Sequence, residues 1–272
     1  MVSPTFTPRF ALSWFFLLAY AWTWLCWWTL YAATLGYVSL PVAREHLATL
    51  GQFGPFAAAL MVTTATIGRA GVRELLLSLV RWRAHPRWLV ISLLLLPATM
   101  MAAIVIYALV KNGSLDGLQF RGSWSTLPRD FIYLLILGGA LGEEPGWRGF
   151  ALPRMQARYG PLAASAGLGL LHAVWHLPLW WLYPPPCPFP LYVAGVVSMT
   201  VVFTWLWNHT RGSVFYSLIF HASLSTASVR LPEVPAYSIW VLLMWSLALA
   251  LLLYDRKLGF RGLASHLVKP IR

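Results

Sequence analysis

The sequence has few charged residues for its length. Asp, Glu, Lys and Arg make up 10% of its 272 residues, whereas a soluble domain has about 25%. So few charged side chains could not cover the surface of a soluble domain of this size. The chain is also 59% hydrophobic, with a mean hydropathy of +0.66. We therefore predict an integral membrane protein.

Acidic residues and cysteines are both scarce. Only 8 Asp and Glu stand against 20 Lys and Arg, which gives a net charge of +12. In a soluble protein such an excess would suggest nucleic-acid binding, but here the basic residues lie mostly between apolar runs. We interpret them as topology signals and contacts to anionic lipids of the bilayer, and expect no nucleic-acid partner. Cys26 and Cys187 lie far apart and predict neither a disulfide framework nor a zinc knuckle.

Apolar runs that could cross a bilayer recur along the whole chain. A membrane-spanning helix needs about 20 apolar residues, and the first run is too long for a signal peptide, whose apolar region has about 7–15. The pattern predicts an all-α fold, with residues 1–272 forming a single transmembrane domain of about eight helices in the cell membrane. The predicted spans are Phe10–Ala33, Gly51–Gly68, Trp88–Val110, Phe131–Leu152, Pro161–Tyr183, Leu191–Asn208, Ser213–Val229 and Tyr237–Tyr254.

Basic residues in the connecting segments predict the orientation of the chain. Cytoplasmic loops have an excess of Lys and Arg, and the two richest segments are residues 69–87 and the tail after residue 254. Placing both in the cytoplasm agrees with an even number of spans and puts both termini there. Five basic residues are then left outside: Arg44, Lys111, Arg121, Arg129 and Arg230.

The fourth predicted span contains Glu143, Glu144 and Arg148. A charge at the bilayer centre costs about 2.5–3.5 kcal/mol on insertion scales, so two adjacent carboxylates need compensation. Arg148 lies four residues after Glu144, on the same helix face, and can neutralise it. Glu143 points about 100° away and has no obvious partner in its own helix. Glu143 is thus the candidate general base, although the Pro-Gly pair that follows would also suit a turn with both acids in a cytoplasmic loop.

Two later spans add imidazole groups. His172 and His176 are four residues apart in the fifth predicted span and therefore share a helix face. His221 lies in the seventh, with Ser225 one turn later on the same face. A lone membrane histidine is often only a satisfied core residue. Three helices that each place polar groups near mid-membrane favour one shared pocket, because each group alone would cost insertion free energy.

These groups suit hydrolysis of an amide within the membrane. A carboxylate could deprotonate water with the help of a histidine, while a second histidine and a nearby donor stabilise the oxyanion. The same pocket could instead hold zinc, with Glu143, His172, His176 and His221 as ligands, and the sequence does not separate the two. Other intramembrane proteases have different signatures. The sequence contains no H-E-x-x-H zinc helix, no Gly-x-Ser-Gly site and no pair of aspartates in apolar spans.

At these residues the chain resembles the CPBP family, the CAAX prenyl proteases and bacteriocin-processing intramembrane endopeptidases that are also called Abi proteins. Glu143, Glu144 and Arg148 match the family's Glu-Glu-x-x-x-Arg motif. His176 and His221 match the histidines of its Phe-x-x-x-His and His-x-x-x-Asn motifs. The resemblance implies an eight-helix bundle with its site opening within the membrane.

The resemblance also implies a glutamate-dependent endopeptidase that acts on a membrane-embedded or lipidated peptide. Glu143 and His176 would activate water, and His221 would stabilise the oxyanion. Glu144 and Arg148 would support them. No cofactor is expected to be required. The family was long described as metalloproteases, however, so zinc remains a possible cofactor.

The resemblance covers about residues 129–229, the predicted catalytic core, and departs from the family pattern at two positions. His172 replaces the motif's aromatic residue, which favours a metal or an altered proton path. Ser225 replaces the asparagine and offers one donor on a short arm, where an amide offers two. Ser225 therefore leaves open a non-catalytic immunity or scaffold protein that binds peptide in the same cavity. Clustering near one depth argues against a third hypothesis, a transporter with a proton relay.

Overall fold

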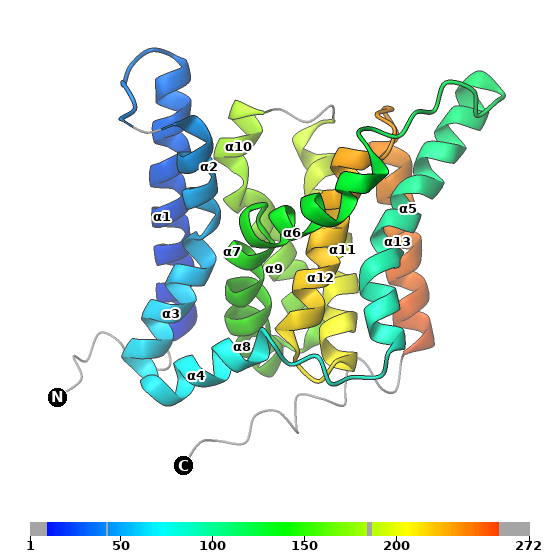
Figure 1. Cartoon of the computed structure of the whole chain (residues 1–272). Helices are drawn as coiled ribbons and strands as arrows, with labels where there is room; N and C mark the ends of the chain where they lie inside the picture. The colour runs from blue at the N-terminus through cyan, green and yellow to red at the C-terminus, as the bar shows by residue number, and fades with distance from the viewer. Residues whose placement is uncertain (1–9, 42, 184–186, 256–272) are drawn as a thin grey trace.

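The computed structural model describes residues 10–41, 43–183 and 187–255, and this part of the chain contains helices and loops but no β-strand (Figure 1). The predicted all-α fold is thus confirmed. The longer helices stand side by side as a bundle. The helices are α1 Ala11–Thr34, α2 Arg44–Gln52, α3 Gly54–Thr66, α4 Arg69–Ser78, α5 Arg87–Asn112, α6 Leu127–Leu137, α7 Ala140–Glu144, α8 Leu152–Tyr159, α9 Pro161–Trp175, α10 Leu177–Leu182, α11 Phe189–His209, α12 Val214–Arg230 and α13 Tyr237–Tyr254.

Three of the described helices, α5, α11 and α13, are long and apolar enough to cross a membrane. The pair α2 and α3, bent by 43°, would make a fourth span if the two act together. Helix α1 has 24 residues and no charged side chain, but its many Trp, Tyr and Thr residues lower its hydropathy. Trp and Tyr are enriched at membrane interfaces. The number of eight spans stays a prediction, because the described residues contain three candidate spans, or four if α2 and α3 act together. The cytoplasmic location of the termini also stays a prediction, and residues 1–9 and 256–272 lie outside the described part.

The predicted span Gly51–Gly68 is not one straight helix, because it begins in α2 and crosses the 43° bend into α3. Two further predicted spans are wrong as continuous helices. Within Phe131–Leu152, α6 ends at Leu137 and α7 begins at Ala140, with Gly139 between them at φ +103°. Within Pro161–Tyr183, the helix breaks at His176. Pro178, two residues further on, has no amide hydrogen to continue the α-helical bonding. Each break lies next to a candidate site residue.

The segment between α7 and α8, Pro145–Ala151, is a turn of π-helix. Such wide turns are rare and frequently occur at functional sites. The segment packs backbone to backbone against the bend between α2 and α3. A Cβ at Gly142 would lie 2.5 Å from the carbonyl oxygen of Gln52, and one at Gly146 would lie 2.5 Å from that of Pro55. Only glycine permits this approach, which fixes the two glutamates that lie between these glycines.

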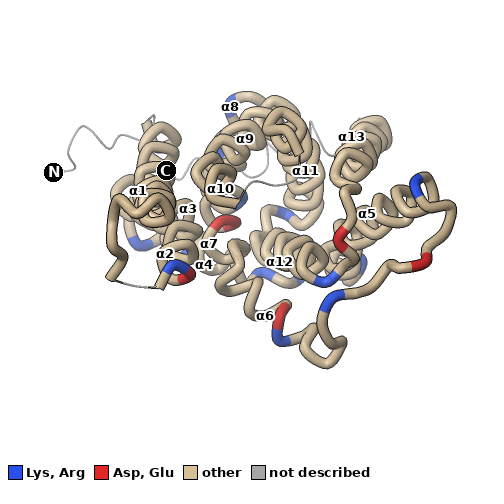
Figure 2. The backbone as a smooth tube through the Cα atoms, turned by 90° about the horizontal axis from the view of Figure 1, so that it is seen from above, with Lys and Arg blue, Asp and Glu red and all other residues tan. Residues whose placement is uncertain are grey.

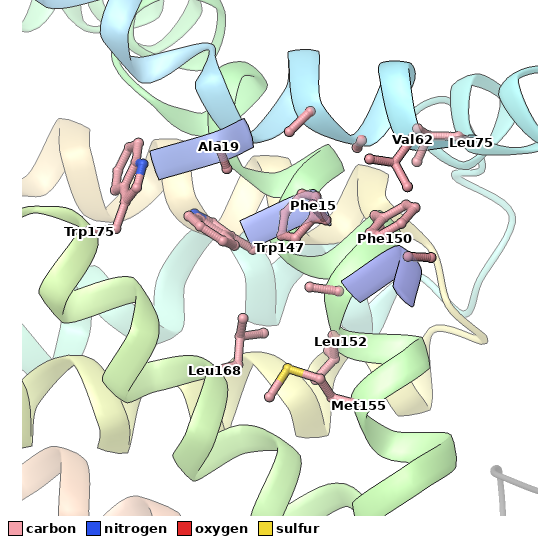
Figure 3. Packing of buried hydrophobic residues seen from close by; sticks show 14 of the residues in the cluster. Phe15, Ala19, Val62, Leu75, Trp147, Phe150, Leu152, Met155, Leu168 and Trp175 are labelled. Carbon is pink, nitrogen blue, oxygen red and sulfur yellow. The ribbon is translucent and has the colours of Figure 1, made fainter. Parts of the chain in front are cut away.

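An aromatic core holds the π-helical segment from the side of α1 and α9 (Figure 3). Trp147 is fully buried and makes edge contacts with Phe15 of α1 and Trp175 of α9, at centroid distances of 5.5 and 5.6 Å. Phe150 stacks on Phe15 at 4.9 Å. Such aromatic pairs contribute about 0.5–1.5 kcal/mol each beyond their area burial. The glutamate-bearing segment is therefore rigidly packed.

A second core joins α5, α11, α12 and α13 through Leu96, Phe203, Phe220 and Met244. In the view from above, most residues of the bundle are uncharged (Figure 2). Acidic residues lie at α7, with other helices around them. Helix α7 ends in Glu143 and Glu144, both buried. The alternative that both acids lie in a cytoplasmic loop is therefore wrong.

Candidate active site

The position of His221 along helix α12 shows how deep the candidate site lies in the bundle. Its 17 residues span about 25 Å at 1.5 Å per residue. At its start, the Ser213 hydroxyl donates to the carbonyl of Arg81 at 2.6 Å. At its end, Arg230 donates to the carbonyl of Arg121 at 2.9 Å. His221 is the eighth of the 17 residues, so the site lies midway between the two ends.

Glu143 has a partner on another helix. Its Oε2 lies 2.9 Å from Nε2 of His172 on α9, and both side chains are buried. An ionised carboxylate only accepts hydrogen bonds, so His172 donates from Nε2. The other ring nitrogen of His172, Nδ1, is buried without a hydrogen-bond partner among the described residues. His172 thus orients the carboxylate that the sequence singles out as the base.

Glu144 contacts two basic side chains in the interior. Its Oε1 accepts from the Arg148 guanidinium at 3.1 Å and lies 2.8 Å from Nδ1 of His221. Arg148 is fully buried, with its guanidinium carbon 4.0 Å from the centroid of the Phe203 ring. The predicted neutralisation of Glu144 by Arg148 is confirmed. The link from Glu144 to His221 could not be derived from helix spacing, because it joins two separate helices.

His176 lies at the break between α9 and α10, where its ring is aimed by the main chain. Its Nδ1 is 3.1 Å from the carbonyl oxygen of His172. A carbonyl oxygen only accepts, so Nδ1 carries the hydrogen and Nε2 is left as an acceptor or ligand. The rings of His172 and His176 stack at a centroid distance of 4.9 Å. The two histidines, predicted to share a helix face, are therefore in direct contact.

The polar groups open onto a cavity of about 490 Å³, which is within the usual range for small-molecule sites. Glu143, His172, His176, His221 and Ser225 all line it, as the sequence predicts for a shared pocket. Glu144 and Arg148 do not line it and lie buried behind these residues. Much of the remaining wall is apolar, including Met100, Ile104, Val196, Met199, Leu224 and Trp240.

Gly139 lies beside one oxygen of Glu143 and one ring nitrogen of His221. A Cβ at this position would lie 2.7 Å from Oε1 of Glu143 and 3.4 Å from Nε2 of His221. Oε1 is the oxygen that His172 does not engage, and Nε2 is the nitrogen that Glu144 does not engage. The two unengaged atoms therefore flank the same small space. The Gly138-Gly139 pair was the only sequence signal for this feature.

Three of the four candidate zinc ligands are grouped tightly enough for one ion. Donor atoms of Glu143, His172 and His176 all lie within 4.8 Å of one another. Catalytic zinc sites use three such N or O ligands and keep the fourth position for water or substrate. His221 is outside this group and pairs with Glu144 instead. The donor set thus fits zinc without His221.

Two charged residues at the cavity wall had no signal in the sequence. Arg121, from the loop between α5 and α6, and Glu233, from the loop between α12 and α13, form an ion pair at 3.1 Å. Their loops are separated by more than a hundred residues in the chain. Only tertiary packing shows that they share the cavity with Glu143.

Comparison with known proteins agrees with the motifs. Residues 125–227 match the family of Rce1-like Type II CAAX prenyl endopeptidases. CAAX prenyl protease 2 of Methanococcus maripaludis is 27% identical over 271 residues, which cover 92% of this chain and 96% of that protein. The matched family segment includes all the motif residues and excludes Arg121. The resemblance to the CAAX prenyl proteases is therefore confirmed, and this chain is embedded in a membrane.

Proposed function

From this kinship with the Rce1-like CAAX prenyl endopeptidases, we propose that the protein is an intramembrane endopeptidase. It hydrolyses a peptide bond of a membrane-associated or lipidated substrate with water activated by Glu143. One observation carries the proposal: a carboxylate, three imidazoles and a hydroxyl line a single cavity midway along the bundle. Isolated polar groups at that depth would only cost insertion free energy.

The first step is attack by water. Oε1 of Glu143 takes a proton from a water molecule whose oxygen attacks the scissile carbonyl carbon. The hydrogen bond from His172 to Oε2 fixes the carboxylate, so Oε1 faces the space beside Gly139. Nε2 of His176, whose ring is aimed by the carbonyl of His172, orients the same water. The carbonyl π electrons move to its oxygen and form the oxyanion.

The second step is collapse of this intermediate. Nε2 of His221 donates to the oxyanion while Nδ1 donates to Glu144, so the ring acts as an imidazolium balanced by that carboxylate. Ser225 adds one hydroxyl donor on the same wall. The carbonyl re-forms, the C–N bond breaks, and protonated Glu143 returns its proton to the leaving amine. Preorganised donors of this kind typically contribute 10²–10³-fold in kcat.

The proposal requires no metal. If zinc binds, Glu143, His172 and His176 would hold it, and it would supply a Lewis acid and an activated water. His221 would keep its contact with Glu144 in either case. Metal content decides between the two forms of the mechanism.

The apolar walls indicate the substrate class. Side chains of α5, α11 and α13 line the cavity together with the catalytic groups, among them Ile104, Met199 and Trp240. Such walls suit a hydrocarbon chain attached to the peptide, because each buried CH₂ contributes about 0.8 kcal/mol. The Methanococcus relative is named a prenyl protease, and we propose a prenylated or otherwise lipidated peptide for this chain as well.

The test is cleavage of matched peptides, with and without a farnesyl group, by detergent-purified protein. We expect the wild type to cleave the lipidated peptide, and Glu143→Gln to lose about 10²–10⁴-fold in kcat, the usual contribution of a general base. Glu74→Gln serves as control, because Glu74 is exposed on α4 and pairs with Arg81 away from the cavity. Full activity in Glu143→Gln would refute the assignment of the base.

Ser225 supports a second candidate function, a non-catalytic immunity or scaffold protein. A single short-armed hydroxyl stands on the cavity wall where the family motif has an amide. This function predicts that a Glu143→Ala, His176→Ala double variant still binds the lipidated peptide and that the wild type does not cleave it.

A further inference from the structure

Arg121 is the only lysine or arginine among the described residues that line the cavity. It lies in the loop between α5 and α6, outside the segment that matches the family. The mechanism gives it no role. The acidic side chains on the wall are those of Glu143 and Glu233.

The main chain at the end of α12 holds the Arg121 guanidinium in place. Nε donates to the carbonyl of Leu231 at 3.0 Å, and one terminal nitrogen donates to the carbonyl of Ser228. The Arg121 amide donates to the carbonyl of Arg230 at 2.9 Å. These contacts fix the side chain and leave its other terminal nitrogen for a further acceptor.

That further acceptor is at present the carboxylate of Glu233, at 3.1 Å. The Glu233 side chain is 84% exposed and that of Arg121 is 41% exposed. Exposed pairs of this kind contribute little to stability, because solvent and salt screen the two charges. Another carboxylate could therefore replace Glu233 at little cost, whereas the arginine would stay in position.

We propose that Arg121 is a specificity-determining residue that binds the C-terminal carboxylate of the substrate peptide. This inference rests on the proposed endopeptidase function. Arginine is well suited to carboxylates because its planar group presents several donors. Repulsion from Glu143 directs the charged end away from the reacting centre and toward Arg121. A CAAX sequence ends in such a carboxylate, three residues after its lipidated cysteine.

The distance between His221 and Ser228 on α12 suits a substrate with a short segment between the scissile bond and its C-terminus. His221 and Ser228 lie seven residues apart on this helix, a rise of about 10 Å. Both line the cavity, the first beside the reacting centre and the second beside Arg121. Three extended residues also span about 10 Å. Arg121 therefore lies within reach of the end of a short peptide segment that begins at the reacting centre.

The test compares two farnesylated peptides of one sequence, with a free carboxylate or an amide at the C-terminus. Binding is first measured to Glu143→Gln, so that the result does not depend on turnover. We expect the acid to bind at least tenfold more tightly than the amide. Adding Arg121→Gln should abolish this preference and leave amide binding unchanged. Glu233→Gln, which removes the competing carboxylate, should tighten acid binding severalfold.

Arg129→Gln is the matched control, because Arg129 is an exposed arginine that pairs with Asp130 outside the cavity. Arg121→Lys keeps the charge and should keep part of the preference, and the melting temperature reports any loss of folding. Equal binding of acid and amide by the parent protein would overturn the inference. Cleavage of both peptides at equal rates would overturn it while the endopeptidase function stands. If the protein binds the acid more tightly than the amide but cleaves neither peptide, the inference stands and the endopeptidase function is overturned.

Discussion

At the scale of single residues, Ser225 is where the catalytic cavity differs most from the family motif. A Ser225→Asn change restores an amide, with two donors on a longer arm, at a position that already faces the cavity. We expect kcat to rise about tenfold or more with little change in KM, since one oxyanion donor is typically worth 10²–10³-fold in kcat. Steady-state kinetics on one lipidated peptide measures both constants. A lower kcat with an unchanged melting temperature would contradict the role given to Ser225.

His172 is the second position that departs from the family motif. Its hydrogen bond to Glu143 can be tested separately from its packing. His172→Phe restores the motif's aromatic ring but removes the donor to Oε2 of Glu143. A hydrogen bond to a charged group contributes about 1.5–3 kcal/mol, so we expect kcat to fall at least about tenfold. His172→Gln keeps a donor and should recover part of the loss. If the Phe variant is as active as the wild type, His172 only fills space beside Trp147.

At the scale of elements, we expect the break between α6 and α7 to position the proposed base, Glu143. Gly139 has φ +103°, and a Cβ there would lie 2.7 Å from Oε1 of Glu143. Gly139→Ala should therefore displace the carboxylate and reduce kcat at least tenfold, in addition to a strain of about 1–3 kcal/mol. Gly113→Ala is the matched control, with φ +69° and no atom within 4 Å of the added Cβ.

Activity and melting temperature together separate the two effects of Gly139→Ala. We expect both alanine variants to melt at lower temperature, but only Gly139→Ala to lose activity in the folded state. Equal activity of the two variants would show that the break does not position Glu143.

Local chemistry made some of these elements predictable and others not. The bounds predicted for the last span coincide with α13, because its apolar run is uninterrupted. The break at Gly139 was missed, since apolar residues continue on both sides and two glycines alone do not end a membrane helix. The pairing of Arg148 with Glu144 follows from helix spacing. The contacts of Glu143 with His172 and of Glu144 with His221 depend on how separate helices pack.

At the scale of the whole molecule, low charge and long apolar runs were enough to predict a helical membrane protein. The number of spans was not predictable in the same way, because several helices are short, bent or rich in Trp. The predicted orientation has a consequence for the cavity. The 79–86 segment and Arg121 lie at opposite ends of α12. If the arginine-rich segment is cytoplasmic, the loop of Arg121 faces the other side.

This orientation is measurable by cysteine labelling in intact cells. In a Cys187→Ser background, we expect Asp116→Cys to react with a membrane-impermeant maleimide from outside, and Arg83→Cys to react only after permeabilisation. Both positions are exposed loop residues. Cys26, the native cysteine that remains in this background, is buried and should not dominate the labelling. The reverse labelling pattern would invert the predicted topology and place the loop of Arg121 in the cytoplasm.

The central claim is that Glu143 activates water without a metal ion. The most direct measurement is metal content together with cleavage of a lipidated peptide on one detergent-purified sample, before and after chelation, with Glu143→Gln beside the wild type. The account predicts wild-type cleavage at far less than one metal ion per chain, no effect of the chelator, and loss of cleavage in the variant. Cleavage that requires one zinc per chain, or that survives in Glu143→Gln, would contradict it.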